Sequence, residues 1–163
     1  MGHNCSDYSF DFNGNAGGES TATSNSNHTN ILAATISRGD GLNASDNGDR
    51  FNATSWNTGD LAAAESGGDY MEFTISSAQG FQLKPYDITI NFQRSGTGVR
   101  KLALKSSADN YTAVIDGEKS IADDTSTTAV TFLVNANTAS ASVTFRIYGY
   151  EAESTGGSGG FEG

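Results

Sequence analysis

The fold class is decided by residues 143–150, which read VTFRIYGY. Val143, Phe145 and Ile147 share one face of an extended chain, while polar or aromatic residues hold the other face. This period of two is the pattern of a β-strand that turns one side toward a hydrophobic core. We therefore predict a strand here.

The same alternation recurs along the chain and predicts about eight or nine strands. Helical patterns are nearly absent, apart from one short turn of helix inside a loop at residues 60–66. Strands with one apolar face are typical of antiparallel sheets that are covered on one side. We predict an all-β protein, a single antiparallel β-sandwich of the jelly-roll type with no substantial helix. The other apolar stretches lie at residues 8–12, 32–36, 70–75, 81–94, 101–105, 111–115 and 130–134.

The charge balance excludes several function classes. The 163 residues include 9 Lys and Arg against 19 Asp and Glu, a formal net charge of −10. Such a chain offers no basic patch for nucleic acid or an anionic membrane. One Cys excludes a disulfide framework and a Cys-rich zinc site, and two His leave little for His-based metal or triad chemistry. No stretch approaches the ~20 apolar residues needed to cross a bilayer, so we expect no membrane insertion.

The length suits one domain, which we place at residues 7–163. Residues 1–6, with the single Cys5, are predicted to be a terminal tail or a remnant of expression. The polar run 13–30 is predicted to be a flexible loop, and 154–163 a Gly-rich end. The chain starts without the apolar region of a signal peptide, and its composition is typical of secreted β-proteins. We therefore expect an extracellular or cell-surface protein whose signal peptide has been removed.

Several stretches together resemble a β-sandwich accessory module found in large secreted proteins of environmental bacteria. The resemblance runs from about Tyr8 to Gly163. It implies a non-catalytic module, similar in shape to jelly-roll carbohydrate-binding modules, that accompanies polysaccharide-degrading enzymes, adhesin-like repeats and surface anchors. In such modules the Gly-rich turn at 154–162 usually leads into one more strand, so we expect either a truncated end or an open sheet edge. The stretches that carry the resemblance are 36–42, 50–56, 69–75, 94–100 and 144–150.

Aromatic residues suggest a sugar-binding surface. Arg146, Tyr148 and Tyr150 lie opposite the apolar face of their strand, and an exposed ring can lie flat against a pyranose. Tyr70 faces outward on another strand and joins them if the strands are neighbours. The alternative is that these tyrosines stabilise the sheet by cross-strand packing. Trp56, the only Trp, is either a ligand platform or an anchor that pins a long loop to the core.

The Gly-rich turn between Arg94 and Arg100 carries a cation at each end. One interpretation is a charged rim that grips hydroxyls or carboxylates of a glycan. The other is a hairpin turn whose arginines pair with acidic neighbours in a very acidic protein.

A cluster of oxygen donors suggests structural calcium, which takes six to eight hard oxygen ligands. The alternative is ordinary Asn and Asp turn chemistry. The candidate ligands are Asp40, Asn43, Asp46 and Asp49.

Two functions follow. The first is a secreted, non-catalytic module that binds a polysaccharide or cell-surface glycan through Tyr148, Tyr150 and Arg146, with the other named aromatic and Arg residues at the rim. The second is a structural subunit of an extracellular filament or adhesin, in which the Tyr8–Phe12 strand of one subunit completes the sheet of its neighbour. We expect no enzyme, because neither His lies where it would act as a positioned base.

Overall fold

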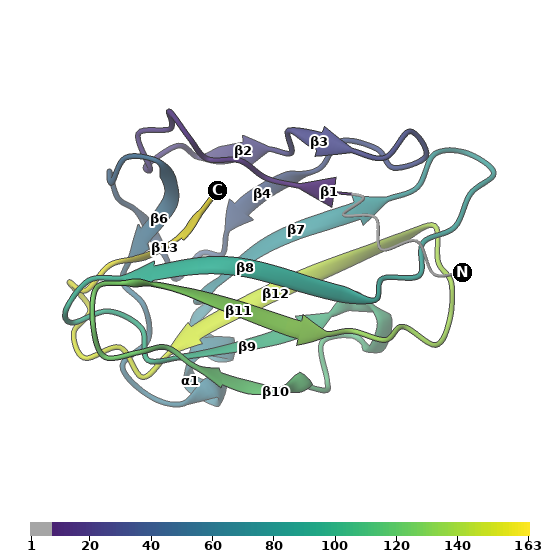
Figure 1. Ribbon diagram of the computed structural model, residues 1–163. Coiled ribbons are helices and arrows are strands. Elements are labelled where there is room, and N and C mark those ends of the chain that lie inside the picture. The colour runs from purple at the N-terminus through teal and green to yellow at the C-terminus, as the bar shows by residue number, and fades with distance from the viewer. Residues whose placement is uncertain (1–7) are drawn as a thin grey trace.

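The computed structural model describes residues 8–163 and shows an all-β domain of two facing sheets (Figure 1). The strands are β1 (Tyr8–Ser9), β2 (Thr21–Thr23), β3 (Ser26–Asn27), β4 (Thr35–Arg38), β5 (Asn43–Ala44), β6 (Arg50–Thr54), β7 (Tyr70–Ser76), β8 (Asp87–Arg94), β9 (Lys101–Ser106), β10 (Ile115–Ser120), β11 (Thr127–Leu133), β12 (Ser142–Tyr150) and β13 (Gly159–Glu162). One α-helix, α1 (Leu61–Gly67), and one 3-10 turn, η1 (Ser107–Asp109), complete the described elements.

All strand pairs are antiparallel. One sheet has the order β10-β9-β12-β7-β4-β2 and the other β11-β8-β13-β6-β5, while β1 and β3 form a separate pair. The prediction of an antiparallel β-sandwich is confirmed, and the jelly-roll topology stays a prediction. In residues 8–163 no helix is long and apolar enough to cross a membrane.

The core lies between the two sheets and is built by the alternation that predicted the strands. Phe145 and Ile147 of β12 are fully buried, as are Phe92 of β8 and Phe132 of β11. Phe73 of β7 lies beside Phe145 with ring centroids 5.7 Å apart. Burial of a large apolar side chain contributes roughly 1.5–3 kcal/mol, so these facing rings hold the layers together.

The short helix forms where the sequence predicts it. The Asp60 side chain accepts a hydrogen bond from the Ala63 N–H at the first turn, and Gly68 ends the helix with φ of 78°. A capping Asp and a left-handed Gly are the ordinary start and stop signals of a helix. The prediction of a strand at residues 111–115 is wrong, because Asn110 and Tyr111 both have positive φ, which is not an extended conformation. The strand β10 begins only at Ile115.

The polar run 13–30, predicted to be a flexible loop, contains β2 and β3. β2 pairs with β4 at the edge of the six-stranded sheet. The Arg38 guanidinium donates to the carbonyls of Gly17 at 2.9 Å and Glu19 at 2.6 Å, which ties the run to β4. The run therefore lies along the sandwich rather than apart from it. The predicted tail at residues 1–6, with Cys5, lies outside the described residues.

Residues 159–162 of the Gly-rich end, which the sequence predicts to be part of a turn, form the strand β13. β13 lies between β6 and β8 and pairs with both. Gly is required there, because a Cβ on Gly159 would stand 2.6 Å from Cζ of Phe92, and one on Gly160 would stand 2.7 Å from the Phe51 carbonyl. Absent side chains let this strand pass between its neighbours and over the core rings.

Candidate functional site

The predicted sugar platform is covered. Tyr148 is 4% exposed and Tyr150 is 1% exposed, and both belong to a small apolar cluster with Ala64 of α1 and Ala103 of β9. The helix lies over the outer face of the six-stranded sheet where these rings stand. The expectation of an exposed aromatic surface at Tyr148 and Tyr150 is therefore wrong, and the packing alternative describes them.

Arg146 and Tyr70 meet as expected, because β12 pairs with β7. The Arg146 guanidinium lies 4.4 Å from the Tyr70 ring centroid and 4.0 Å from that of Tyr111. Its Nε donates to Glu72 Oε2 at 2.6 Å, and the Tyr70 ring meets the Tyr148 ring edge-on at 5.2 Å. The Arg146 guanidinium therefore occupies the faces of the Tyr70 and Tyr111 rings, on which a pyranose would need to stack.

Trp56 is the anchor rather than the platform. Its side chain is fully buried, and the indole Nε1–H donates to the Ala53 carbonyl at 3.1 Å. The ring meets Phe92 edge-on at a centroid distance of 6.2 Å. It also packs so closely against Gly149 that a Cβ there would stand 2.6 Å from the indole. Trp56 therefore fixes the loop after β6 to the core.

Arg94 and Arg100 are neutralised by acidic neighbours, as the hairpin interpretation predicts. The Arg94 side chain has no exposed surface; its Nη1 lies 2.6 Å from Asp123 Oδ1 and its Nη2 lies 3.2 Å from Glu153 Oε1. Nη2 also donates to the Gly96 carbonyl at 3.0 Å. Arg100 reaches the same two carboxylates, each at 2.9 Å. The hydrogen bond from Arg94, with help from Arg100, holds the pKa of Asp123 below its usual value.

The candidate calcium ligands do not converge. In the part of the chain that the structure describes, no group of three or more His, Cys, Asp or Glu side chains could hold a metal ion. Asp40 and Asp46 are exposed. Asn43 Nδ2 donates to Ser55 Oγ at 2.8 Å, and Asp49, with φ of 61°, accepts from the Gly14 N–H at 2.8 Å. Both side chains therefore bond to segments distant in the sequence, and calcium binding stays a prediction.

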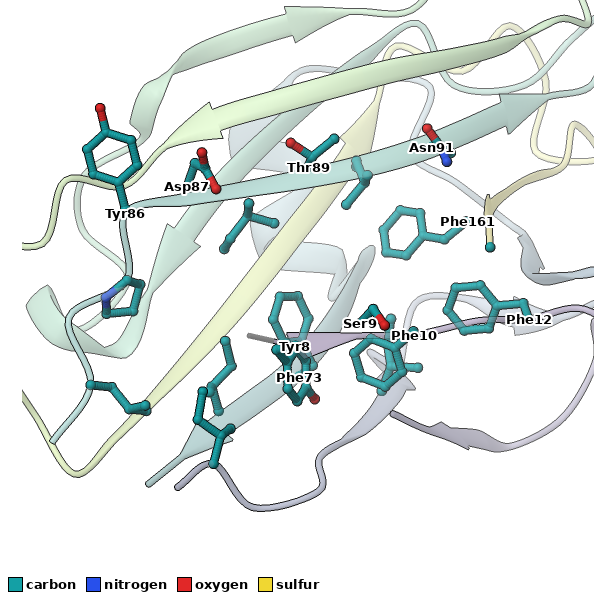
Figure 2. Close-up of a pocket in the computed structure, with 18 of the residues that line it drawn as sticks. Tyr8, Ser9, Phe10, Phe12, Phe73, Tyr86, Asp87, Thr89, Asn91 and Phe161 are labelled. Carbon is teal, nitrogen blue, oxygen red and sulfur yellow. The ribbon is translucent and has the colours of Figure 1, made fainter. Parts of the chain in front are cut away.

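A cleft that sequence reasoning missed opens between the sheets beside β8 (Figure 2). Its volume is about 950 Å³. Phe10 and Phe12 of the N-terminal segment, Phe73 of β7 and Phe161 of β13 contribute aromatic rings, and Ile88 adds an aliphatic side chain from β8. Tyr86 stands at the mouth and is 62% exposed. The cleft is therefore apolar inside and reachable from solvent.

The cleft lies beside the part of β8 that is not paired with β13. The pairing of the two strands ends where Glu162 lies opposite Asn91, while β8 continues back to Asp87. Gly163, the next residue, lies against Asp11 of the N-terminal segment. Among residues 8–163, no strand pairs with β8 on this side from Asp87 to Ile90. The sequence signal for this cleft is the apolar alternation of Ile88, Ile90 and Phe92. Of these three residues, only Phe92 lies opposite a residue of β13.

The open stretch of β8 directs backbone hydrogen-bonding groups into the gap. The Ser95 N–H donates to the Ser158 carbonyl at 2.8 Å, on the β13 side. Alternate residues of an antiparallel strand bond to the same neighbour, so the odd-numbered residues of β8 face that side. Asp87 and Thr89 therefore point their N–H and C=O groups where β13 has ended. Unpaired edge groups of this kind are a template for another strand.

Charged groups at the cleft are sparse and mostly acidic. Asp87, Glu162 and Lys84 are the charged residues of its lining. Glu162 is neutralised by Arg50, whose Nη2 lies 3.0 Å from its Oε1. Asp87 is exposed and, among the described residues, has no ion pair. No protein-family model and no curated protein matches this chain, so the interpretation of the cleft rests on this geometry.

Proposed function

We propose that this domain is a structural subunit of an extracellular assembly that accepts an extended polypeptide strand at the open edge of β8. One observation carries the proposal: backbone groups of Asp87 and Thr89 face an apolar cleft with no strand beside them. An added strand would satisfy those groups and place alternate side chains over the core. Recognition by strand addition has this form, with main-chain bonds for affinity and pockets for specificity.

The N-terminal segment is not the strand that fills this cleft. Tyr8–Ser9 pairs with β3 of the same chain, and the Phe10 ring meets Phe73 edge-on at 5.9 Å. The Phe12 ring stacks with Phe51 at 6.1 Å. A neighbour's copy of this segment would take the same position and leave the gap open. A strand that fills the gap would lie between β8 and the N-terminal segment.

A proline at Thr89 is expected to abolish strand binding while the fold persists. Proline removes the N–H that faces the gap, and its ring blocks the approach of another backbone. A labelled neutral peptide of alternating valine and threonine, titrated by fluorescence anisotropy, should bind the wild-type chain at least about tenfold more tightly than Thr89→Pro.

The matched control for this experiment is Thr131→Pro on β11. Leu133 donates its N–H outward to the Asp116 carboxylate at 3.0 Å, so by alternation the Thr131 N–H also points away from β8. Thr89 and Thr131 share one hydroxyl contact of 2.8 Å, which both variants lose equally. Equal peptide binding by the two proline variants, or no binding by the wild-type chain, would contradict the proposal.

Carbohydrate binding is the second candidate, and one observation favours it: Tyr86 is 62% exposed at the mouth of the cleft, beside Lys84 and Asp87. A ring that is open to solvent can lie against a sugar, and the charged neighbours can bond to hydroxyls. Tyr86→Ala should abolish retention in polysaccharide affinity gels, whereas Tyr148→Phe, which alters a buried ring, should leave it unchanged. Equal mobility of wild type and Tyr86→Ala across a broad glycan panel would exclude this function.

A further inference from the structure

The sequence Asn-Gly occurs twice in the chain, as Asn13–Gly14 and as Asn47–Gly48. Asparagine is a chemically labile residue, and it loses its side-chain amide most easily before glycine. The backbone nitrogen of the glycine can then attack Cγ of the asparagine without hindrance from a Cβ. Whether the reaction takes place in a folded protein depends on whether that nitrogen is free, and the two pairs differ in this respect.

At the first pair, the glycine nitrogen is engaged. The Gly14 N–H donates to Asp49 Oδ1 at 2.8 Å. Asp49 is itself held in place, because its own N–H donates to the Asn15 carbonyl at 3.0 Å. A hydrogen bond to a carboxylate is one of the stronger kinds, and the negative charge beside the nitrogen disfavours loss of its proton. Asn13 is therefore protected, although its side chain is exposed.

At the second pair, the glycine nitrogen is free. Gly48 is exposed, and within residues 8–163 its N–H donates no hydrogen bond. Space around it is open, because the nearest atom to a Cβ placed there would be the Asn15 carbonyl oxygen at 3.9 Å. The residues on both sides of Gly48 are fixed: the Asn47 N–H donates to the Ala16 carbonyl at 2.8 Å, and Asp49 is bonded as described.

We propose that Asn47 is a site of spontaneous deamidation and that the fold protects Asn13 from the same reaction. The Gly48 nitrogen attacks Asn47 Cγ and forms a succinimide ring. The bond from Cγ to Nδ2 breaks, and Nδ2 leaves as ammonia with the proton from the Gly48 nitrogen. Water then opens the ring. Attack of water at Cγ gives aspartate, and attack at the main-chain carbonyl carbon gives isoaspartate.

The isoaspartate product disturbs the contact between this loop and the polar run 13–30. It adds a carbon atom to the main chain between Asn47 and Asp49, whose N–H groups bond to the run at 2.8 Å and 3.0 Å. The two bonds cannot both keep these lengths when the segment between them is longer. Loss of the bond from Asp49 frees the Gly14 nitrogen, so Asn13 becomes reactive after Asn47.

The test follows amide loss in the intact chain by mass spectrometry. Trypsin separates the two pairs into the peptides 1–38 and 39–50 after incubation in mildly alkaline buffer. Initial conversion at Asn47 is expected to be at least about tenfold faster than at Asn13, because a hydrogen bond to a charged group must first break at Asn13. In guanidinium chloride this bond is absent, and the two pairs should react at similar rates.

Two variants test the two halves of the proposal. Gly48→Ala places a methyl group in open space, so the fold should persist while conversion at Asn47 slows. Asp49→Gly suits the left-handed backbone, with φ of 61°, and removes the carboxylate; conversion at Asn13 should become faster. The matched control is Asp116→Gly, at another aspartate with a positive φ of 56° in β10, which should leave Asn13 unchanged.

Contrary outcomes are equally clear. Equal rates at the two pairs in the folded chain, or faster conversion at Asn13, would overturn the proposal. A difference that persists in guanidinium chloride would assign the selectivity to the neighbouring residues in the sequence and overturn the role of the fold. The same holds if Asp49→Gly leaves Asn13 unchanged, or if Asp116→Gly accelerates it equally.

Discussion

Replacing Trp56 with alanine is expected to lower the free energy of unfolding by about 3–5 kcal/mol. The indole is fully buried against Phe92 and fills the space that Gly149 and Gly159 leave open. Backbone around these glycines is held in paired strands, so the cavity cannot collapse. Urea unfolding followed by far-UV circular dichroism measures the loss.

Trp56 also reports its own burial, because it is the only Trp in the chain. Emission of the folded protein should be blue-shifted and should move to longer wavelength on unfolding. Trp56→Phe is the matched variant: it keeps a ring in the cavity but leaves the Ala53 carbonyl without its indole donor, so its stability should lie between wild type and Trp56→Ala. Emission typical of an exposed Trp, or full stability of Trp56→Ala, would contradict the anchor assignment.

Replacing Arg94 with methionine is expected to lower the free energy of unfolding by about 2–3 kcal/mol. Methionine keeps much of the aliphatic volume, so the loss is that of the ion pairs and of the bond to the Gly96 carbonyl. The value lies below that of a fully buried pair because Asp123 and Glu153, whose side chains are 63% and 39% exposed, regain water. Arg100→Met, at a one-third exposed residue on the same carboxylates, should cost less.

At acidic pH, the free energies of unfolding of the wild-type protein and of Arg94→Met should become more similar. The hydrogen bond from Arg94 is the largest cause that lowers the pKa of Asp123 from its ordinary 3.8. A carboxyl whose pKa is lowered in the folded state contributes stability above the ordinary value, and this contribution is lost as pH falls through the folded value. Unfolding curves of the two proteins should therefore converge below about pH 4. A constant difference down to strongly acidic pH would assign the stabilisation to packing alone.

Strand positions were predictable where side chains alternate. Residues 70–75, 130–133 and 143–147 lie within strands of the structure, and only Val134 of these predicted ranges falls outside, because an apolar face every second residue has no other stable use than covering a core. The helix was predictable from Asp60 and Gly68 for a similarly local reason. The strand β13 was not predictable, because its two glycines have no side chains that could show an alternating pattern. Its position also depends on contacts with Phe92 and Phe51, which come from distant parts of the chain.

The candidate site was harder to predict than the fold. Outward residues of β12 and β7 look alike in sequence whether water or a helix covers them, and only the docking of α1 buries Tyr148 and Tyr150. Likewise, two arginines beside a glycine turn do not reveal that Asp123 and Glu153 converge on them from separate loops. Asp87 and Thr89 were overlooked because nothing about them is unusual before their neighbouring strand is known.

The sequence alone determined the β-sandwich class, the inward face of the main strands and the short helix. These depend on periodicity and capping, which act between residues close in the chain. Only the tertiary structure decided which surfaces remain open, because that depends on where strands of unequal length pair. The Gly-rich residues 159–162, expected to be part of a turn, form a central strand between β6 and β8, because their pairing partners are far away in the sequence.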